Sequence, residues 1–258
     1  MIYRRQWVDR HCVCPWCEHH GQLTPYEWIE LLLDPDSFVL RDADMEPAYS
    51  PCFANAQQSY HDKRMQARVN AGTNEALIAG SAMIGGLPLE IVIAKFAFLG
   101  SSLGAVVGER VACAAERAAR QGVPLISINA AGGAGMYEGV IALMQMAKVS
   151  VALKALDEAS QLHVSVLVDQ CYGGVCACYA SMADVVLAEP GAQIGCTGPR
   201  VIEQTTRQTV PADFQTAEVL LAGGMIDRVV PRSDLRATLQ RLLRLHQPAC
   251  RTGAACDE

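Results

Sequence analysis

Residues 124–134 (PLISINAAGGA) and residues 163–174 (HVSVLVDQCYGG) show the same order of features. In each stretch an apolar run of strand length leads into a Gly-Gly pair, and a helical pattern follows. Strands that alternate with helices predict parallel strands joined by right-handed crossovers. We therefore expect an α/β protein in which Gly132-Gly133 and Gly173-Gly174 each lie at a strand end.

The alternation continues on both sides of these stretches. Strands are predicted over residues 76–80, 87–98, 185–188 and 226–230, with a hairpin turn at Gly85-Gly86. Helices are predicted from Thr24, over 60–69, over 103–120 after a cap at Ser101 or Ser102, over 136–159, and over 234–245 after a cap at Ser233. The rest of residues 34–74 is polar and predicts irregular structure. This pattern alone permits a doubly wound sheet or a spiral of ββα units.

The composition fits one large domain with a short N-terminal appendage. Of 258 residues, 51% are hydrophobic and 19% are charged, and the net charge of −6 argues against a surface built to bind nucleic-acid phosphates. The first ten residues are charged and lack the apolar core of a signal peptide, and no apolar run reaches the ~18 residues that span a bilayer. We expect a soluble cytoplasmic protein whose 11 cysteines are reduced.

The two glycine pairs are the strongest candidates for chemistry. A helix N-terminus exposes unpaired N–H groups with partial positive charge, and glycine carries no side chain to keep a ligand away. Such a pair can hold an anion or a developing oxyanion. The alternative is that each pair only permits a tight turn, and the residues leave both interpretations open. Neither a dinucleotide fingerprint nor a P-loop occurs.

Side chains suited to catalysis are scarce. His163 lies in an apolar strand and is interpreted as a core histidine. Glu109 and Glu138 lie in predicted helices, where a paired or solvated role is the more common one. A reaction in which backbone N–H groups act on a group carried by a cofactor needs few catalytic side chains, so it would be consistent with this sequence.

The first twenty residues contain one C-x-x-C motif, Cys14-Pro15-Trp16-Cys17. Structural zinc requires four ligands, so a zinc ribbon needs a second pair. We expect Cys14 and Cys17 to be metal ligands in a partial ribbon that binds zinc weakly, with a nearby histidine as an added ligand. The start of the chain is either shortened or degenerate relative to a full ribbon.

Several blocks together resemble the β subunit of the acetyl-CoA carboxylase carboxyltransferase family. They are residues 96–109 (FAFLGSSLGAVVGE), 131–134 (AGGA) followed by Met136 and Glu138, 143–148 (LMQMAK), 173–175 (GGV), 188–190 (AEP) and 198–205 (GPRVIEQT). The similarity extends over most of the chain, from about Cys14 to Leu245.

The resemblance implies a crotonase-type spiral of ββα units with an N-terminal partial zinc ribbon. It divides the chain into residues 1–23 (ribbon-like), 24–246 (crotonase-type carboxyltransferase) and 247–258 (a disordered tail). It also implies binding of acetyl-CoA, stabilisation of its enolate, and carboxylation from carboxybiotin on a separate biotin carboxyl carrier protein to give malonyl-CoA. An α subunit would supply the carboxybiotin side, in a homodimer or a heterotetramer.

Site residues follow from the same resemblance by position. The catalytic backbone donors are Gly132, Gly133, Gly173 and Gly174. The substrate-binding residues are Phe98, Gly100, Ser101, Ala131, Ala134 and Met136.

Three departures from the family's pattern leave other functions open. Ala131 stands where the family has serine, Gly135 where it has arginine, and residues 169–172 (DQCY) replace a Pro-Thr-Thr run. A missing guanidinium removes a fixed cation and up to five donors. One alternative is a biotin-independent crotonase-type decarboxylase or acyltransferase that acts on malonyl thioesters. Another is a non-enzymatic substitute or resistance subunit, or an RNA-binding protein that uses Arg4, Arg5 and Arg10.

Overall fold

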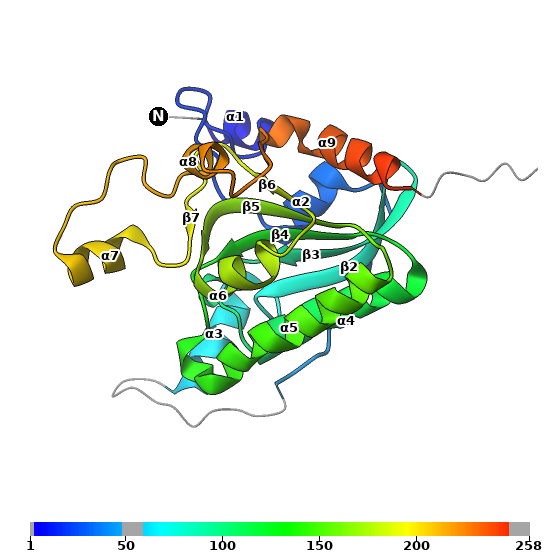
Figure 1. The fold of residues 1–258 in the computed structure, drawn as a ribbon, viewed down its shortest axis with the longest axis horizontal. Helices are drawn as coiled ribbons and strands as arrows, with labels where there is room; N and C mark the ends of the chain where they lie inside the picture. Colours follow the sequence, from blue (N-terminus) through cyan, green and yellow to red (C-terminus); the bar gives the residue numbers. More distant parts are fainter. Residues whose placement is uncertain (1–2, 48–58, 248–258) are drawn as a thin grey trace, which may run out of the picture.

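One mixed β-sheet forms the centre of the computed structural model, which describes residues 3–47 and 59–247 (Figure 1). The strand order is β1-β2-β3-β4-β5-β6-β8, and β7 pairs with β5. Strands β1, β2 and β3 are antiparallel, whereas β3 through β8 are parallel. Of the tail predicted over residues 247–258, residues 248–258 lie outside the described part of the chain.

The strands have these bounds: β1 Val39–Arg41, β2 Leu77–Ile84, β3 Leu87–Ala94, β4 Leu125–Ala131, β5 His163–Tyr172, β6 Val185–Ala188, β7 Ile194–Gly195 and β8 Arg228–Val229. The helices are α1 Arg4–Asp9, α2 Pro25–Leu32, α3 Tyr60–Ala71, α4 Ala105–Gln121, α5 Val140–Glu158, α6 Gly173–Val175, α7 Pro199–Thr206, α8 Ala217–Ala222 and α9 Arg232–Leu245. Shorter turns are η1 Leu99–Ser101, η2 Met136–Glu138 and the π-helical η3 Cys176–Ala180.

Helices cover both faces of the sheet. Helices α4 and α5 lie on one face, and α2 and α9 lie on the other (Figure 1). Alternate residues of the parallel strands enter the two apolar clusters: Leu125 and Leu167 face α4 and α5, while Ile126 and Val166 face α2 and α9. Helix α7 projects away from the body of the molecule in Figure 1.

Local signals placed several element boundaries correctly. Thr24 begins α2 with a capping box, in which its side chain accepts the N–H of Glu27 and the Glu27 carboxylate accepts the N–H of Thr24. Gly85-Gly86 connects β2 and β3, and the Asp34 carboxylate accepts both glycine N–H groups at 2.8 and 2.7 Å. These turn and cap predictions are confirmed.

Other boundary predictions were wrong. The N-cap of α4 is Gly104 instead of a serine, because Ser101 is buried and its hydroxyl donates to the Ala76 carbonyl. The N-cap of α9 is Pro231 rather than Ser233. Strand β1 lies in a stretch predicted to be irregular, where pairing with β2 orders it.

The helix predicted over residues 136–159 is interrupted. Residues Met136–Glu138 form a 3₁₀ turn, Gly139 leaves helical geometry with φ 55° and ψ −128°, and α5 begins only at Val140. The Gly132-Gly133 pair therefore lies in a turn after β4 and not at a helix start.

A buried ion pair ties the N-terminal segment to the core. Arg232 contacts both oxygens of Glu189 at 2.6 Å, and the two side chains are 2% and 1% exposed. The same guanidinium donates to the His11 carbonyl at 2.6 Å and lies 5.0 Å from the Trp28 ring. One side chain thus joins α9, the end of β6 and residues 11–28.

Within the described residues, no helix is both long and apolar enough to span a membrane.

His163 is a core histidine, as expected. It is 3% exposed, its Nε2 is 3.0 Å from the Ser127 hydroxyl, and burial lowers its pKa from 6.5 to about 4. Protonation is therefore easier in the unfolded chain, so stability is complete above pH 6.5 and declines as the pH falls towards 4. We expect a loss of about 3 kcal/mol of unfolding free energy over that interval.

Urea unfolding between pH 4 and 7 measures this loss. His163→Gln should flatten the profile, while substitution of the exposed His61 by Gln should leave it unchanged. An unchanged slope in His163→Gln would assign the acid sensitivity to other groups.

Candidate active site

The two glycine turns meet at the carboxyl ends of β4 and β5. A Cβ on Gly173 would lie 2.7 Å from the Gly133 Cα, well inside contact distance. Both residues also have positive φ, +129° at Gly133 and +62° at Gly173. A side chain at Gly173 would therefore force the two turns apart.

The glycine N–H groups are not equivalent. The Gly132 N–H donates to the Gly100 carbonyl at 2.7 Å and is already used. The N–H groups of Gly133 and Gly174 have no acceptor among residues 3–47 and 59–247. Gly133 is held in place because its carbonyl accepts the Leu103 N–H at 2.8 Å.

A cleft of about 700 Å³ opens beside the two turns. Gly132, Gly133 and Gly173 line it, but Gly174 does not, and a Cβ on Gly174 would point towards Leu103 and Ala134. The remaining lining comes from the end of β5, the residues on either side of β7 and the start of α7: Asp169, Gln170, Tyr172, Gln193, Cys196, Thr197, Gly198, Pro199, Arg200 and Val201.

A second cavity of about 280 Å³ adjoins the same turn, and Gly132 lines both spaces. Phe98, Ala134 and Met136 line this second cavity, together with residues of α3 and the start of α4. Three of the predicted substrate-binding residues therefore line the same cavity. The other three, Gly100, Ser101 and Ala131, do not line either cavity.

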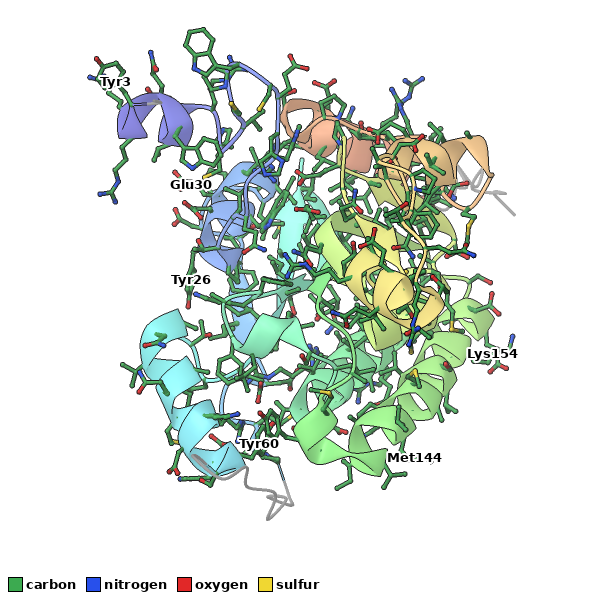
Figure 2. The ribbon with its side chains drawn as sticks, turned by 90° about the vertical axis from the view of Figure 1, so that its left-hand side faces the viewer. Tyr3, Tyr26, Glu30, Tyr60, Met144 and Lys154 are labelled. Atoms are coloured by element: carbon green, nitrogen blue, oxygen red, sulfur yellow. The ribbon has the colours of Figure 1, made fainter. Side chains whose placement is uncertain are left out.

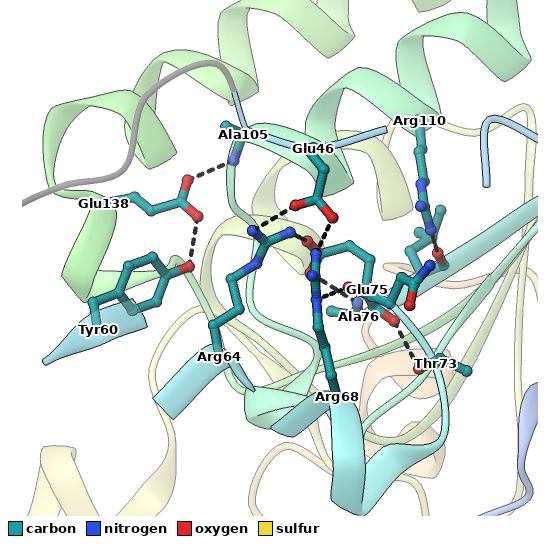
Figure 3. A network of polar contacts seen from close by, with 12 residues as sticks. Glu46, Tyr60, Arg64, Arg68, Thr73, Glu75, Ala76, Ala105, Arg110 and Glu138 are labelled. Atoms are coloured by element: carbon teal, nitrogen blue, oxygen red, sulfur yellow. Dashed lines mark hydrogen bonds and ion pairs between the residues drawn. The ribbon is translucent and has the colours of Figure 1, made fainter. Parts of the chain in front are cut away.

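A polar network closes the second cavity on the α3 side (Figure 3). The Glu138 carboxylate accepts the Tyr60 hydroxyl at 2.7 Å and the Ala105 N–H at 2.6 Å. Burial and the neighbouring Glu138 raise the pKa of Tyr60, so the phenol stays a neutral donor. The Arg64 guanidinium forms an ion pair with the Glu75 carboxylate at 2.7 Å, and Glu75 lines the cavity.

Glu138 and Glu109 are both paired, in agreement with their interpretation from the sequence. Glu138 caps the start of α4, where the helix N-terminus favours negative charge. Glu109 pairs with Lys148 of α5.

The cysteine-rich segment does not fit a closed zinc site. Cys14 is buried and Cys17 is exposed. The backbone N–H groups of Cys17 and Trp16 donate to the Cys14 sulfur and lower its pKa. Among the residues that the structure describes, no three His, Cys, Asp or Glu side chains converge as metal ligands. His20 turns towards the Glu18 carbonyl and Arg232 instead, so the zinc expectation is not supported.

Comparison with known proteins identifies the family. Residues 18–228 match the model of the carboxyl transferase domain. The chain belongs to the carboxyl transferase family. Its relatives include the acetyl-coenzyme A carboxylase carboxyl transferase subunit beta of Herpetosiphon aurantiacus, which is 55% identical over 96% of this chain and 83% of the relative. A subunit beta 2 of Roseiflexus sp. is 51% identical over 100% of this chain and 85% of the relative.

Solved structures of distant sequence share the fold. Transcarboxylase 12S with hydrolysed methylmalonyl-coenzyme A superposes with a TM-score of 0.74 at 23% identity, over 93% of this chain and 43% of that chain. A Pseudomonas malonate decarboxylase hetero-tetramer in complex with malonate gives 0.68 at 24% identity, over 88% and 84%. The expected crotonase-type α/β fold of a carboxyl transferase is confirmed.

Several residues that line the two cavities were not predicted. Tyr60 and Tyr137 line the second cavity, but the stretch around Tyr60 carried only a weak helical pattern. Asp169, Tyr172 and Arg200 line the larger cleft. Arg200 belongs to the GPRVIEQT block, residues 198–205, and the resemblance of this block to the carboxyltransferase family could have indicated Arg200 as a site residue.

Proposed function

We propose that this chain is the β subunit of an acetyl-CoA carboxylase carboxyltransferase, which binds an acyl-CoA and stabilises its enolate. The observation that carries the proposal is the contact between the Gly133 and Gly173 turns beside an open cleft. The names of the relatives give the substrate class.

Gly133 is the proposed principal oxyanion donor. Its N–H has no acceptor in the described chain, and its turn lines the cleft. Negative charge develops on the thioester oxygen when a proton leaves the neighbouring carbon, and a fixed N–H donor stabilises it by about 3–4 kcal/mol. The Gly174 N–H, in the neighbouring turn, also has no acceptor among the described residues, but Gly174 does not line the cleft. Gly132 positions the turn through its bond to Gly100.

The two cavities suit two co-substrates that meet at Gly132. The smaller one combines apolar side chains, Phe98, Ala134 and Met136, with polar groups from the α3 side, and a mixed lining of this kind suits the amides and methylenes of the pantetheine arm of an acyl-CoA. The larger cleft reaches the same turn from the other side, between Tyr172 and Arg200. Carboxybiotin on a separate carrier protein would supply the carboxyl group there.

An exposed apolar stripe on α5 supports a partner subunit. Val140, Met144 and Val151 are 68%, 59% and 72% exposed, at a spacing that places them on one face of the helix. Met144 points outward in Figure 2. Met136, which lines the smaller cavity, is 87% exposed. We propose that this stripe docks the α subunit, in a heterotetramer.

We also place the enzyme in the cytoplasm. The cysteines that the structure describes are all free thiols, as a reducing compartment would keep them.

The decisive experiment runs the reaction in reverse. Purified chain is incubated with malonyl-CoA and free biotin, with and without a carboxyltransferase α subunit, and acetyl-CoA is followed by mass spectrometry. Acetyl-CoA should form only when both the α subunit and biotin are present.

Turnover without α subunit or biotin would instead assign the chain to the malonyl thioester decarboxylases. Absence of turnover under every condition, with the α subunit shown to bind, would indicate a non-enzymatic subunit.

A further inference from the structure

The Glu138 carboxylate joins three segments beside the first glycine turn. It accepts the N–H of Ala105 at 2.6 Å and the hydroxyl of Tyr60 at 2.7 Å (Figure 3). The fit is close, because a Cβ on Gly104 would lie 2.7 Å from a Glu138 oxygen. One half-buried carboxylate therefore connects η2 with the starts of α3 and α4.

The backbones of η1, η2 and the glycine turn are joined as well. The Leu103 N–H donates to the Gly133 carbonyl at 2.8 Å, and the Leu103 carbonyl accepts the Gly135 N–H at 2.8 Å. The Gly135 carbonyl in turn accepts the N–H of Glu138 at 2.9 Å. Together with the side-chain contact to the start of α4, these bonds close a clamp that holds Gly133. The clamp is made of residues 103–105 and 133–138.

Tyr60 fixes the clamp from α3. Its hydroxyl donates to the Glu138 oxygen that does not accept the Ala105 N–H. Its aromatic ring stacks on Tyr137, the neighbour of Glu138, with ring centroids 5.4 Å apart. Tyr60 is 8% exposed, and a hydrogen bond in such surroundings is stronger than one in water. Both oxygens of the Glu138 carboxylate are therefore held in place.

We propose that Tyr60 and Glu138 are positioning residues that hold the Gly133 N–H in the geometry which the thioester oxygen requires. This inference rests on the proposed function, in which Gly133 is the oxyanion donor. Both side chains act through Ala105 and Leu103, and neither takes a proton from the substrate. A misplacement of about 1 Å can lower a reaction rate about 10²-fold, so a single hydroxyl in the clamp can control turnover.

Tyr60→Phe removes the hydroxyl and keeps the aromatic ring against Tyr137. Its kcat should fall about tenfold or more, while its KM for malonyl-CoA should stay within about twofold. The reason is that Gly133 donates to a charge that develops only in the transition state, and loss of such an interaction lowers kcat without raising KM. Turnover is measured as acetyl-CoA formation with biotin and the α subunit.

Two substitutions of Glu138 separate positioning from acid–base catalysis. Glu138→Ala removes both hydrogen bonds and should lower kcat at least as much as Tyr60→Phe. The side-chain amide in Glu138→Gln can still accept the Ala105 N–H with its oxygen and donate to the Tyr60 hydroxyl with its nitrogen. Glu138→Gln should therefore keep kcat within about threefold of the unchanged chain.

Glu27→Ala is the matched control for Glu138→Ala. The half-buried Glu27 carboxylate also accepts a backbone N–H and a hydroxyl at the start of a helix, both from Thr24, at 2.7 and 2.8 Å. It lies on α2, on the other face of the sheet from α4 (Figure 1). Glu27→Ala loses the same kinds of hydrogen bond and should keep the kcat of the unchanged chain.

Amide hydrogen exchange tests the clamp without any turnover. The N–H groups of Leu103 and Gly135 donate within the clamp. In Tyr60→Phe and Glu138→Ala they should exchange about tenfold faster or more, with little change in the midpoint of urea unfolding. Both amides should keep their exchange rates in the conservative variant Glu138→Gln and in the control Glu27→Ala.

Three outcomes overturn the proposal. The first is a Tyr60→Phe variant with unchanged kcat, whether or not its KM rises, and this variant decides alone should Glu138→Ala not fold. The second is a loss in Glu138→Gln as large as in Glu138→Ala, which would assign the role to the carboxylate charge itself. The third is a lowered kcat while the Leu103 and Gly135 amides keep their exchange rates.

An unchanged chain without turnover would contradict the proposed function alone. The exchange of the Leu103 and Gly135 amides would still show whether Tyr60 and Glu138 hold the turn.

Discussion

Replacing Gly173 by alanine is expected to lower turnover by about 10²- to 10³-fold, the cost of losing one oxyanion donor. The new methyl group would lie 2.7 Å from the Gly133 Cα, so the turn that carries the proposed donor must move. Turnover is measured as acetyl-CoA formation from malonyl-CoA with biotin and the α subunit. The unfolding free energy of each variant is measured alongside.

Gly72→Ala is the matched control. Gly72 has the same φ of +62° as Gly173, but nothing lies within 4 Å of the position its Cβ would take. Both variants share the backbone strain of about 1–2 kcal/mol, and only Gly173→Ala adds the clash. Gly72→Ala should therefore keep its turnover. If Gly173→Ala also keeps turnover within about twofold, the two turns do not form the reaction site.

Replacing Arg232 by methionine is expected to reduce the unfolding free energy by about 3–5 kcal/mol. The substitution leaves the Glu189 carboxylate buried without its partner, and it removes the bond to the His11 carbonyl. Urea unfolding measures the loss. Limited proteolysis should show that residues before Trp28 become accessible first, because Arg232 no longer holds them.

Two further variants separate the causes. In the double variant Arg232→Met with Glu189→Leu no charge is left unpaired, so much of the lost stability should return. Lys154→Met removes a cation from the surface pair with Asp157, where the side chains are 64% and 66% exposed, and should leave the unfolding midpoint nearly unchanged. A loss below about 1 kcal/mol in Arg232→Met would show that the buried pair contributes no more than a surface pair.

Local patterns were enough to place most elements. The apolar runs before each Gly-Gly pair became β4 and β5, and the Thr24 capping box and the Gly85-Gly86 turn appeared where expected. These features depend on residues close together in the chain, so propensity and periodicity report them directly. The long GPRVIEQT block indicated the family for the same reason: the information lies in the sequence itself.

Local patterns misjudged the elements whose form depends on distant partners. Residues 39–41 form a strand because β2 pairs with them, and no apolar alternation marks them. The helix predicted from Met136 begins at Val140 instead, because Glu138 is held by Tyr60 and the Ala105 N–H. Such contacts join residues as far as 78 positions apart, and helical periodicity does not record them.

The sequence by itself determined that two strands of a carboxyltransferase-like chain each end in a glycine turn. Tertiary structure alone decided which amides are free. The register between β4 and β5 shifts after Asn129, so that Ala131 pairs with Cys171 and the two turns come into contact. The Gly100 carbonyl, from a separate turn, accepts the Gly132 N–H, whereas the Gly133 N–H, beside the cleft, has no acceptor among residues 3–47 and 59–247. Both outcomes depend on long-range packing, because a hydrogen-bond partner is chosen by position in space and not by position in the chain.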